Sequence, residues 1–277
     1  MSRYLHRLPD GRKVHIEDCG AGFPVIFQHG LGGDLRQVAY GFPDGLSCRR
    51  ITLECRGHGL SGLASGESYS IAGFADDLIA VADALGLARF AIGGISMGAA
   101  IALRIAALHP GRVTGLMLIR PAWLAEAAPE NMKAFSVIAD HLRQSGRNGR
   151  AAFLASPTGR RLAHEAPDNL ASLAGFFDHP EPAAIAVLLD AIARDGPGVD
   201  ERQIRALKVP ALVVGHGLDL IHPLDYAHRL GEMIPDARVI AITPKAVDRA
   251  GYSADLHAAL TDFIRYLDTF QETCAWP

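Results

Sequence analysis

A serine between two glycines, in Gly94-Ile95-Ser96-Met97-Gly98, has the residue types and spacing that could do chemistry. The apolar run 90–93 precedes it, and a stretch of small residues with helical character follows it. A strand that turns sharply into a helix presents a serine oxygen at the carboxyl edge of a sheet, where ligands bind in open α/β folds. Flanking glycines remove the side chains that would clash in such a turn. The pattern therefore predicts a nucleophile at Ser96.

A second glycine-rich segment, Gln28-His29-Gly30-Leu31-Gly32-Gly33, follows a short apolar run at 24–28. A loop of this kind can direct a backbone N–H toward a reacting oxygen, so the amides of Leu31 and Met97 are expected to form an oxyanion hole. His29 is expected to be a structural or pocket-wall residue in contact with substrate, rather than a base. Trp123 is expected to contact the substrate as well.

Asp219 lies just after another apolar run, 211–215, in the pattern Gly217-x-Asp219-x-x-x-Pro223. A carboxylate in such a loop can orient a histidine and stabilise it when it becomes cationic. The alternative is a turn carboxylate that bonds only to its own backbone. The functional role is favoured because the other motifs point to the same edge of the sheet.

Alternating strands and helices must position these residues. Strands are expected at 24–28, 50–53, 90–93, 113–119, 211–215 and 238–242, after a hairpin of 3–8 and 13–18 around Pro9-Asp10-Gly11. Helices are expected at 71–85, 97–108, 224–233 and 254–270. This rhythm predicts an α/β fold with a mostly parallel sheet covered by helices on both faces.

The rhythm breaks at Arg120, and only helical periods follow as far as residue 198. Helices are expected there at 129–145, 150–154, 167–177 and 182–193. We therefore predict a core in two parts, 1–120 and 199–277, with a helical cap or lid inserted at 121–198.

Composition limits the classes of function. The chain has 277 residues, of which 49% are hydrophobic and 21% charged, and its net charge is −3 without a long basic run. Neither nucleic acid nor a membrane is therefore an expected partner. No signal peptide or membrane-spanning run is recognised, and Cys19, Cys48, Cys55 and Cys274 are scattered, which favours the cytoplasm. A small-molecule substrate is expected, without metal or cofactor, and a homodimer is left open.

The chain resembles the α/β-hydrolase family in QHGLGG at 28–33, RGHGLS at 56–61, GISMG at 94–98 and VPALVVGHGLDLIHP at 209–223. The resemblance covers nearly the whole chain. It implies an eight-stranded core, a helical lid, a serine nucleophile at Ser96 and an acid at Asp219.

The chain departs from the family pattern at the histidine, which normally follows the last strand. The segment 243–252 contains no histidine. His222, three residues after Asp219, is the expected base because an imidazole titrates in the right range. His257, Lys245, Asp248 and a bound water or substrate are the alternatives.

These residues predict a soluble serine hydrolase for a small organic ester, lactone or related carbonyl compound. Two other hypotheses stay open. One is an enzyme of the same fold that cleaves C–C bonds or acts as a lyase or isomerase. The other is a small-molecule-binding protein whose catalytic residues have decayed.

Overall fold

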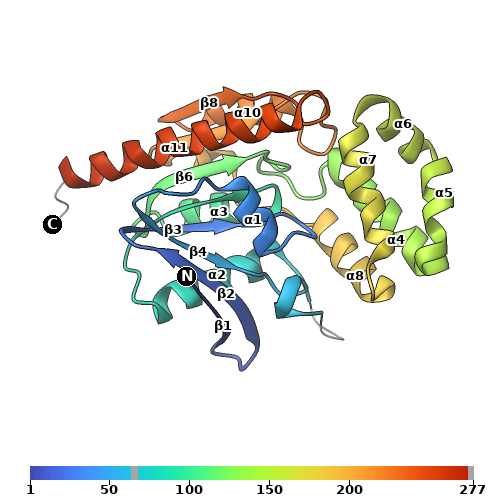
Figure 1. Cartoon of the computed structure of the whole chain (residues 1–277), viewed down its shortest axis with the longest axis horizontal. Helices are drawn as coiled ribbons and strands as arrows, with labels where there is room; N and C mark the ends of the chain where they lie inside the picture. The colour runs from blue at the N-terminus through green and yellow to red at the C-terminus, as the bar shows by residue number, and fades with distance from the viewer. Residues whose placement is uncertain (64–67, 274–277) are drawn as a thin grey trace.

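An eight-stranded sheet runs through the molecule in the order β1-β2-β4-β3-β5-β6-β7-β8 (Figure 1). The computed structural model describes residues 1–63 and 68–273, so Cys274 lies outside it. The hairpin partners β1 and β2 are antiparallel, β2 is antiparallel to β4, and all remaining pairs are parallel. The strands are β1 Ser2–Arg7, β2 Lys13–Gly20, β3 Phe23–Gln28, β4 Cys48–Leu53, β5 Phe90–Ile95, β6 Val113–Ile119, β7 Ala211–Gly215 and β8 Ala237–Ala241. The predicted α/β fold with a mostly parallel sheet is confirmed.

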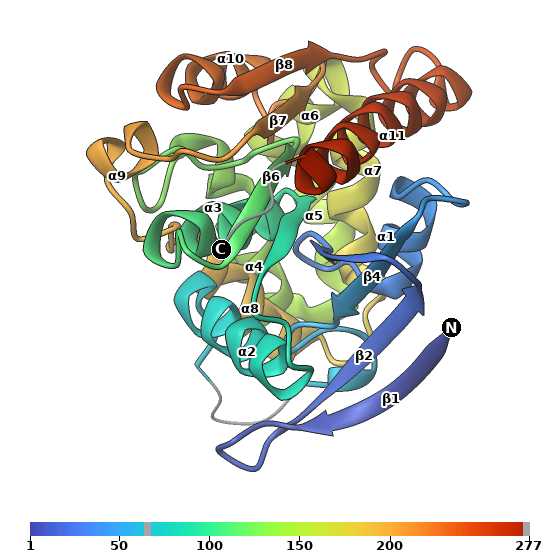
Figure 2. The ribbon, with the colours of Figure 1, turned by 90° about the vertical axis from the view of Figure 1, so that its left-hand side faces the viewer.

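Helices cover both faces of the sheet, as Figure 2 shows from the side. Side chains alternate along each strand, so Ile26 packs toward α2, α3 and α10 while Val25 and Phe27 pack toward α1 and α11. This double burial explains why the strands are unbroken apolar runs. The helices are α1 Leu35–Gly41, α2 Ile71–Ala84, α3 Met97–Leu108, α9 Glu201–Arg205, α10 Leu224–Met233 and α11 Arg249–Thr273.

Five of the six α-helices between β6 and β7 lie together at one end of the sheet (Figure 1). They are α4 Lys133–Ser145, α5 Gly149–Ala155, α6 Pro157–Glu165, α7 Pro167–Ala174 and α8 Pro182–Ala193. Short 3₁₀ helices occur at Gly59–Ser61, Glu130–Met132, Gly146–Asn148 and Gly175–Asp178. Within residues 1–63 and 68–273, no helix is both long enough and apolar enough to cross a bilayer.

Three α-helices, α1, α6 and α9, were absent from the sequence prediction, and each begins with a local cap, which for α9 is the side chain of Asp200. α6 contains Pro157 and Gly159, residue types that usually interrupt a helix, so the sequence predicts no helix there. Pro157 instead occupies the first turn, where its missing N–H costs nothing, and the side chain of Ser156 accepts a hydrogen bond from the amide of Gly159. α1 has seven residues, too few to show a helical period, and is capped by Asp34.

Candidate functional site

Ser96 lies at the junction of β5 and α3 in a strained backbone conformation, with φ 55° and ψ −109°. The flanking glycines are required by close packing of this turn on the neighbouring strand. A Cβ on Gly94 would lie 2.6 Å from the carbonyl carbon of Gly98, and a Cβ on Gly98 would lie 2.5 Å from the carbonyl oxygen of Gln28. The strand, the turn and the helix can therefore meet only if both positions lack side chains.

The ring of His222 lies between Ser96 and Asp219. Its Nε2 is 2.8 Å from Oγ of Ser96, and its Nδ1 is 2.9 Å and 3.0 Å from the two carboxylate oxygens of Asp219. Oδ1 of Asp219 also accepts the backbone N–H of His222 at 3.0 Å. With Nδ1–H directed to the carboxylate, Nε2 has a free lone pair that can accept the serine proton.

Burial and charge set the protonation of this pair. Burial lowers the pKa of His222, Asp219 opposes that effect, and the Arg120 cation adds to the lowering. Burial would raise the pKa of Asp219, but the charges of His222 and Arg120 outweigh it and hold that pKa well below its usual range. The carboxylate is therefore ionised and the imidazole neutral near pH 7, as a proton acceptor requires.

Arg120 also contacts the acid, which the sequence analysis did not predict. It follows β6 directly, at a positive φ of 49°, and its Nε and Nη2 donate to Oδ2 of Asp219 at 2.9 Å and 2.6 Å. The sequence feature that could have identified Arg120 is its position, because it is a charged residue directly after a buried strand. His216, at the end of β7, places its Nε2 3.6 Å from the same oxygen.

Two asparagines tie the loop between Asp219 and His222 to the helices that follow β6. Oδ1 of Asn169, on α7, accepts the amides of Leu220 and Ile221 at 2.8 Å and 3.1 Å. Nδ2 of Asn131 donates to the carbonyl of Ile221 at 2.6 Å. The position of His222 therefore depends on these helices as well as on the sheet.

A cavity of about 600 Å³ opens beside Oγ of Ser96. Leu31, Ser96 and His222 line it from the sheet side, and Phe135, Asn169 and Phe176 line it from the helices after β6. Its volume lies in the range of small-molecule sites. Among the residues that the structure describes, no group of three or more His, Cys, Asp and Glu side chains could hold a metal ion.

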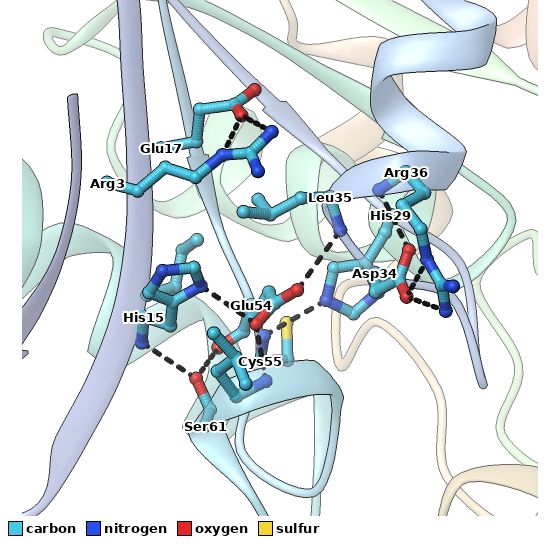
Figure 3. A network of polar contacts seen from close by, with 12 residues as sticks. Arg3, His15, Glu17, His29, Asp34, Leu35, Arg36, Glu54, Cys55 and Ser61 are labelled. Carbon is cyan, nitrogen blue, oxygen red and sulfur yellow. Dashed lines mark hydrogen bonds and ion pairs between the residues drawn. The ribbon is translucent and has the colours of Figure 1, made fainter. Parts of the chain in front are cut away.

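His29 does not line this cavity, so its predicted contact with substrate is wrong. The side chain is fully buried, its Nδ1 bonds to the carbonyl of Gly30 at 2.8 Å, and its Nε2 accepts the amide of Cys55 at 3.0 Å (Figure 3). Both ring nitrogens are thereby occupied. His29 therefore joins two loops, which agrees with the structural role that was expected for it as the alternative to a position in the pocket wall.

Trp123 also lies outside the cavity lining, and its predicted contact with substrate is wrong. The side chain is 1% exposed, and its indole Nε1 donates to the carbonyl of Asp195 at 2.8 Å. A buried indole needs such a partner for its N–H. Trp123 therefore fixes the start of the helical segment to its end.

Glu54, directly after β4, is a buried carboxylate that is not among the predicted site residues. It contacts Nδ1 of His15 at 3.0 Å and accepts the amides of Leu35 and Leu60 at 3.2 Å and 2.6 Å (Figure 3). It thus joins the glycine-rich loop after β3 to the loop after β4. Both loops contribute to the cavity wall.

Three alternative bases lie outside the cavity lining. Nε2 of His257, on α11, lies 2.9 Å from the carbonyl oxygen of Tyr40. Nζ of Lys245 lies 5.8 Å from the centre of the Tyr252 ring. Oδ1 of Asp248 accepts the amide of Ala250 at the start of α11.

The two amides of the predicted oxyanion hole occupy suitable places. Leu31 lines the cavity, and Met97 is the first residue of α3, where an amide has no acceptor within the helix. Their role stays a prediction.

A family model described as the alpha/beta hydrolase fold matches residues 24–244. The chain therefore belongs to the α/β-hydrolase fold family. The match includes the strand–serine–helix turn and the loop with Asp219 and His222.

Relatives of known sequence and structure agree with this assignment. The chain is 30% identical over 259 residues to the dihydrolipoyllysine-residue acetyltransferase component of the acetoin cleaving system of Pseudomonas putida, covering 90% of this chain and 64% of the length of that relative. It is 28% identical over 248 residues to a 2-hydroxymuconate semialdehyde hydrolase of Pseudomonas putida, covering 84% of this chain and 83% of that one. An esterase from Exiguobacterium antarcticum has the same fold, with a TM-score of 0.73, 21% identity, and coverage of 95% and 100%.

Proposed function

We propose that the protein is a serine hydrolase that acts on a small organic ester, lactone or related carbonyl compound. The observation that carries the proposal is the hydrogen bond of 2.8 Å between Oγ of Ser96 and Nε2 of His222, with Asp219 on the other ring nitrogen. A hydroxyl, a neutral imidazole and a carboxylate in this order are the parts of an activated nucleophile. The base comes from the loop after β7 instead of the loop after the last strand.

In the proposed reaction, Oγ of Ser96 attacks the carbonyl carbon while His222 takes the hydroxyl proton. The amides of Leu31 and Met97 stabilise the oxyanion, and Asp219 stabilises the imidazolium. The C=O bond re-forms and the bond from its carbon to the alkoxy oxygen breaks, while His222 gives its proton to that oxygen. The alcohol leaves, and the acyl group stays on the serine. Water then attacks that acyl carbon, its proton passes to His222 and on to Ser96, and the carboxylic acid leaves.

The cavity supports a substrate of modest size. Its volume of about 600 Å³ suits a small organic molecule, and Phe135 and Phe176 offer apolar surface opposite the serine. We propose that the segment 121–198, which carries these two rings, acts as a cap over the site. The hydrolase of 2-hydroxymuconate semialdehyde among the relatives supports a small carbonyl compound.

Reaction with a fluorophosphonate probe tests the proposal, because the probe is attacked by an activated serine. The wild-type protein should be labelled, and Ser96→Ala should not. His222→Ala should be labelled at least about 100-fold more slowly, since a general base contributes about that much or more. His257→Ala is the matched control, because its ring contacts the Tyr40 carbonyl away from the cavity, and it should match the wild type.

The other results have defined meanings. Absence of labelling together with tight binding of small molecules would refute the proposal in favour of a binding protein. Labelling that survives in Ser96→Ala would place the nucleophile elsewhere. Labelling at Ser96 with no turnover of esters or lactones, but cleavage of a C–C bond in a diketone, would favour a reaction other than ester hydrolysis.

A further inference from the structure

Arg120 shares the carboxylate of Asp219 with His222. We propose that Arg120 is a positioning residue, whose guanidinium fixes this carboxylate against the His222 ring and keeps the ring unprotonated in mildly acidic solution. The kinetic part of this inference rests on the proposed function, while the positioning and the protonation of the ring do not.

The two carboxylate oxygens of Asp219 accept hydrogen bonds from different partners. Both Nε and Nη2 of Arg120 donate to Oδ2 of Asp219, whereas Oδ1 receives the backbone N–H of His222. Nδ1 of the ring lies within 3.0 Å of both oxygens. A guanidinium that donates twice to one oxygen prevents the carboxylate from rotating about its bond to Cβ. The orientation of the Asp219 carboxylate toward the imidazole is thereby set by a residue outside the loop that carries Asp219.

Arg120 is itself held firmly. Its backbone N–H donates to the carbonyl of Val214 at 2.7 Å, and its side chain is 15% exposed against 0% for that of Asp219. The hydroxyl of Tyr252, from α11, faces the guanidinium. The backbone of Arg120 is therefore held by β7, and its side chain is largely buried beside α11.

The guanidinium also disfavours a second positive charge beside it. Its Nη2 lies 3.1 Å from Nδ1 of His222, and two cations at that separation repel strongly in a buried site. The charged and titratable groups that face the pair are Asp219 and His216 from the end of β7, Arg120 from β6, Tyr252 from α11, Lys245 from the loop after β8 and Asp168 from α7. Of those acting on the ring, burial and the positive charges lower its pKa, and only Asp219 raises it.

Titration of the His222 ring by NMR in histidine-labelled full-length protein tests the inference without using activity. Arg120→Gln removes the charge but keeps a donor to Asp219, and Arg120→Lys keeps the charge but not the planar fork. We expect the midpoint of His222, assigned by loss of its signal in His222→Gln, to rise by about one pH unit or more in Arg120→Gln. In Arg120→Lys it should stay near the wild-type value.

Two results would overturn the inference. An unchanged midpoint in Arg120→Gln would show that the arginine does not control the ring. If Arg120→Gln fails to fold, a midpoint in Arg120→Lys that rises by about a unit would equally contradict the role of the charge.

Fluorophosphonate labelling across pH separates positioning from substrate binding. Arg120→Gln and Arg120→Lys should both lower the maximal labelling rate about tenfold or more, with little change in the probe concentration at half-saturation, because the carboxylate is no longer fixed by two bonds. A raised half-saturation concentration with an unchanged maximal rate would instead assign Arg120 to ligand binding and refute the inference. A wild-type protein that is not labelled at all would refute the proposed function and leave the NMR result to decide this one.

Discussion

Replacement of Asn169 by leucine should slow the reaction of Ser96 although Asn169 contacts neither Ser96 nor the ring of His222. Its Oδ1 accepts two consecutive backbone amides, of Leu220 and Ile221, and the side chain is buried. Leucine has the same number of side-chain heavy atoms as asparagine, branched at the same carbon, but no acceptor. The substitution therefore removes two hydrogen bonds to the loop and keeps the branching of the side chain.

The expected magnitude follows from these two bonds. Each buried amide left without an acceptor costs about 1–3 kcal/mol. A movement of the loop that exposes these amides to water therefore lowers the free energy. That movement displaces His222, the next residue along the chain. A displacement of about 1 Å in a reacting group lowers a rate about 100-fold. We expect fluorophosphonate labelling to slow by about that factor and the free energy of unfolding to fall by about 2 kcal/mol.

Labelling reactions that are stopped at set times measure the rate of labelling, and urea unfolding of the same preparation measures the free energy of unfolding. Asn169→Asp keeps an acceptor oxygen for both amides and should recover labelling to within about tenfold of the wild type. Asn148→Leu makes the same chemical change at an exposed asparagine and should alter neither quantity. If Asn169→Leu is labelled at the wild-type rate, the loop does not depend on the helices after β6 and the reasoning is wrong.

Two further predictions concern buried groups outside the reaction. Burial lowers the pKa of His58 to about 3, below its unfolded value, so its contribution to stability is complete above pH 6.5 and is lost as pH falls toward 3. Between pH 7 and pH 4, the free energy of unfolding should therefore fall by about 3 kcal/mol less in His58→Gln than in the wild type. Urea unfolding measures this difference, and an equal fall in both proteins would contradict the prediction. Burial raises the pKa of the Cys48 and Cys55 thiols to about 11 and about 12, so a disulfide reagent should modify them only after unfolding, and rapid reaction of either in the native protein would show that its burial is incomplete.

The sequence was sufficient for the parts of the structure that depend on local patterns. Buried parallel strands are continuous apolar runs, so the strand that ends at Ser96 and the strand that precedes Asp219 were both predictable. The carboxyl ends of parallel strands meet at one edge, which is why Ser96, Asp219 and His222 were expected together. The structure brings their side chains into one hydrogen-bonded row.

Other features depended on contacts between distant segments. His29 lies beside a site motif, but its ring is turned away by bonds to Gly30 and to Cys55, 26 residues further along the chain. Arg120 and Asp219 are separated by 99 residues, so no spacing rule could pair them. The ends of helices were the least predictable, because a proline such as Pro157 begins a helix or ends one according to its cap.

The placement of Asp219 and His222 on one short loop has a consequence for how this chain can change over time. A single insertion between these two residues would disturb the contacts of the Asp219 carboxylate with the ring and the backbone N–H of His222. The segment 243–248, by contrast, does not line the cavity beside Ser96, so a longer loop there would leave the contacts among Ser96, Asp219 and His222 unchanged as long as β8 and α11 still pack. Length differences among descendants of this chain should therefore accumulate after β8 and be absent from the heptapeptide Gly217–Pro223, which carries both Asp219 and His222.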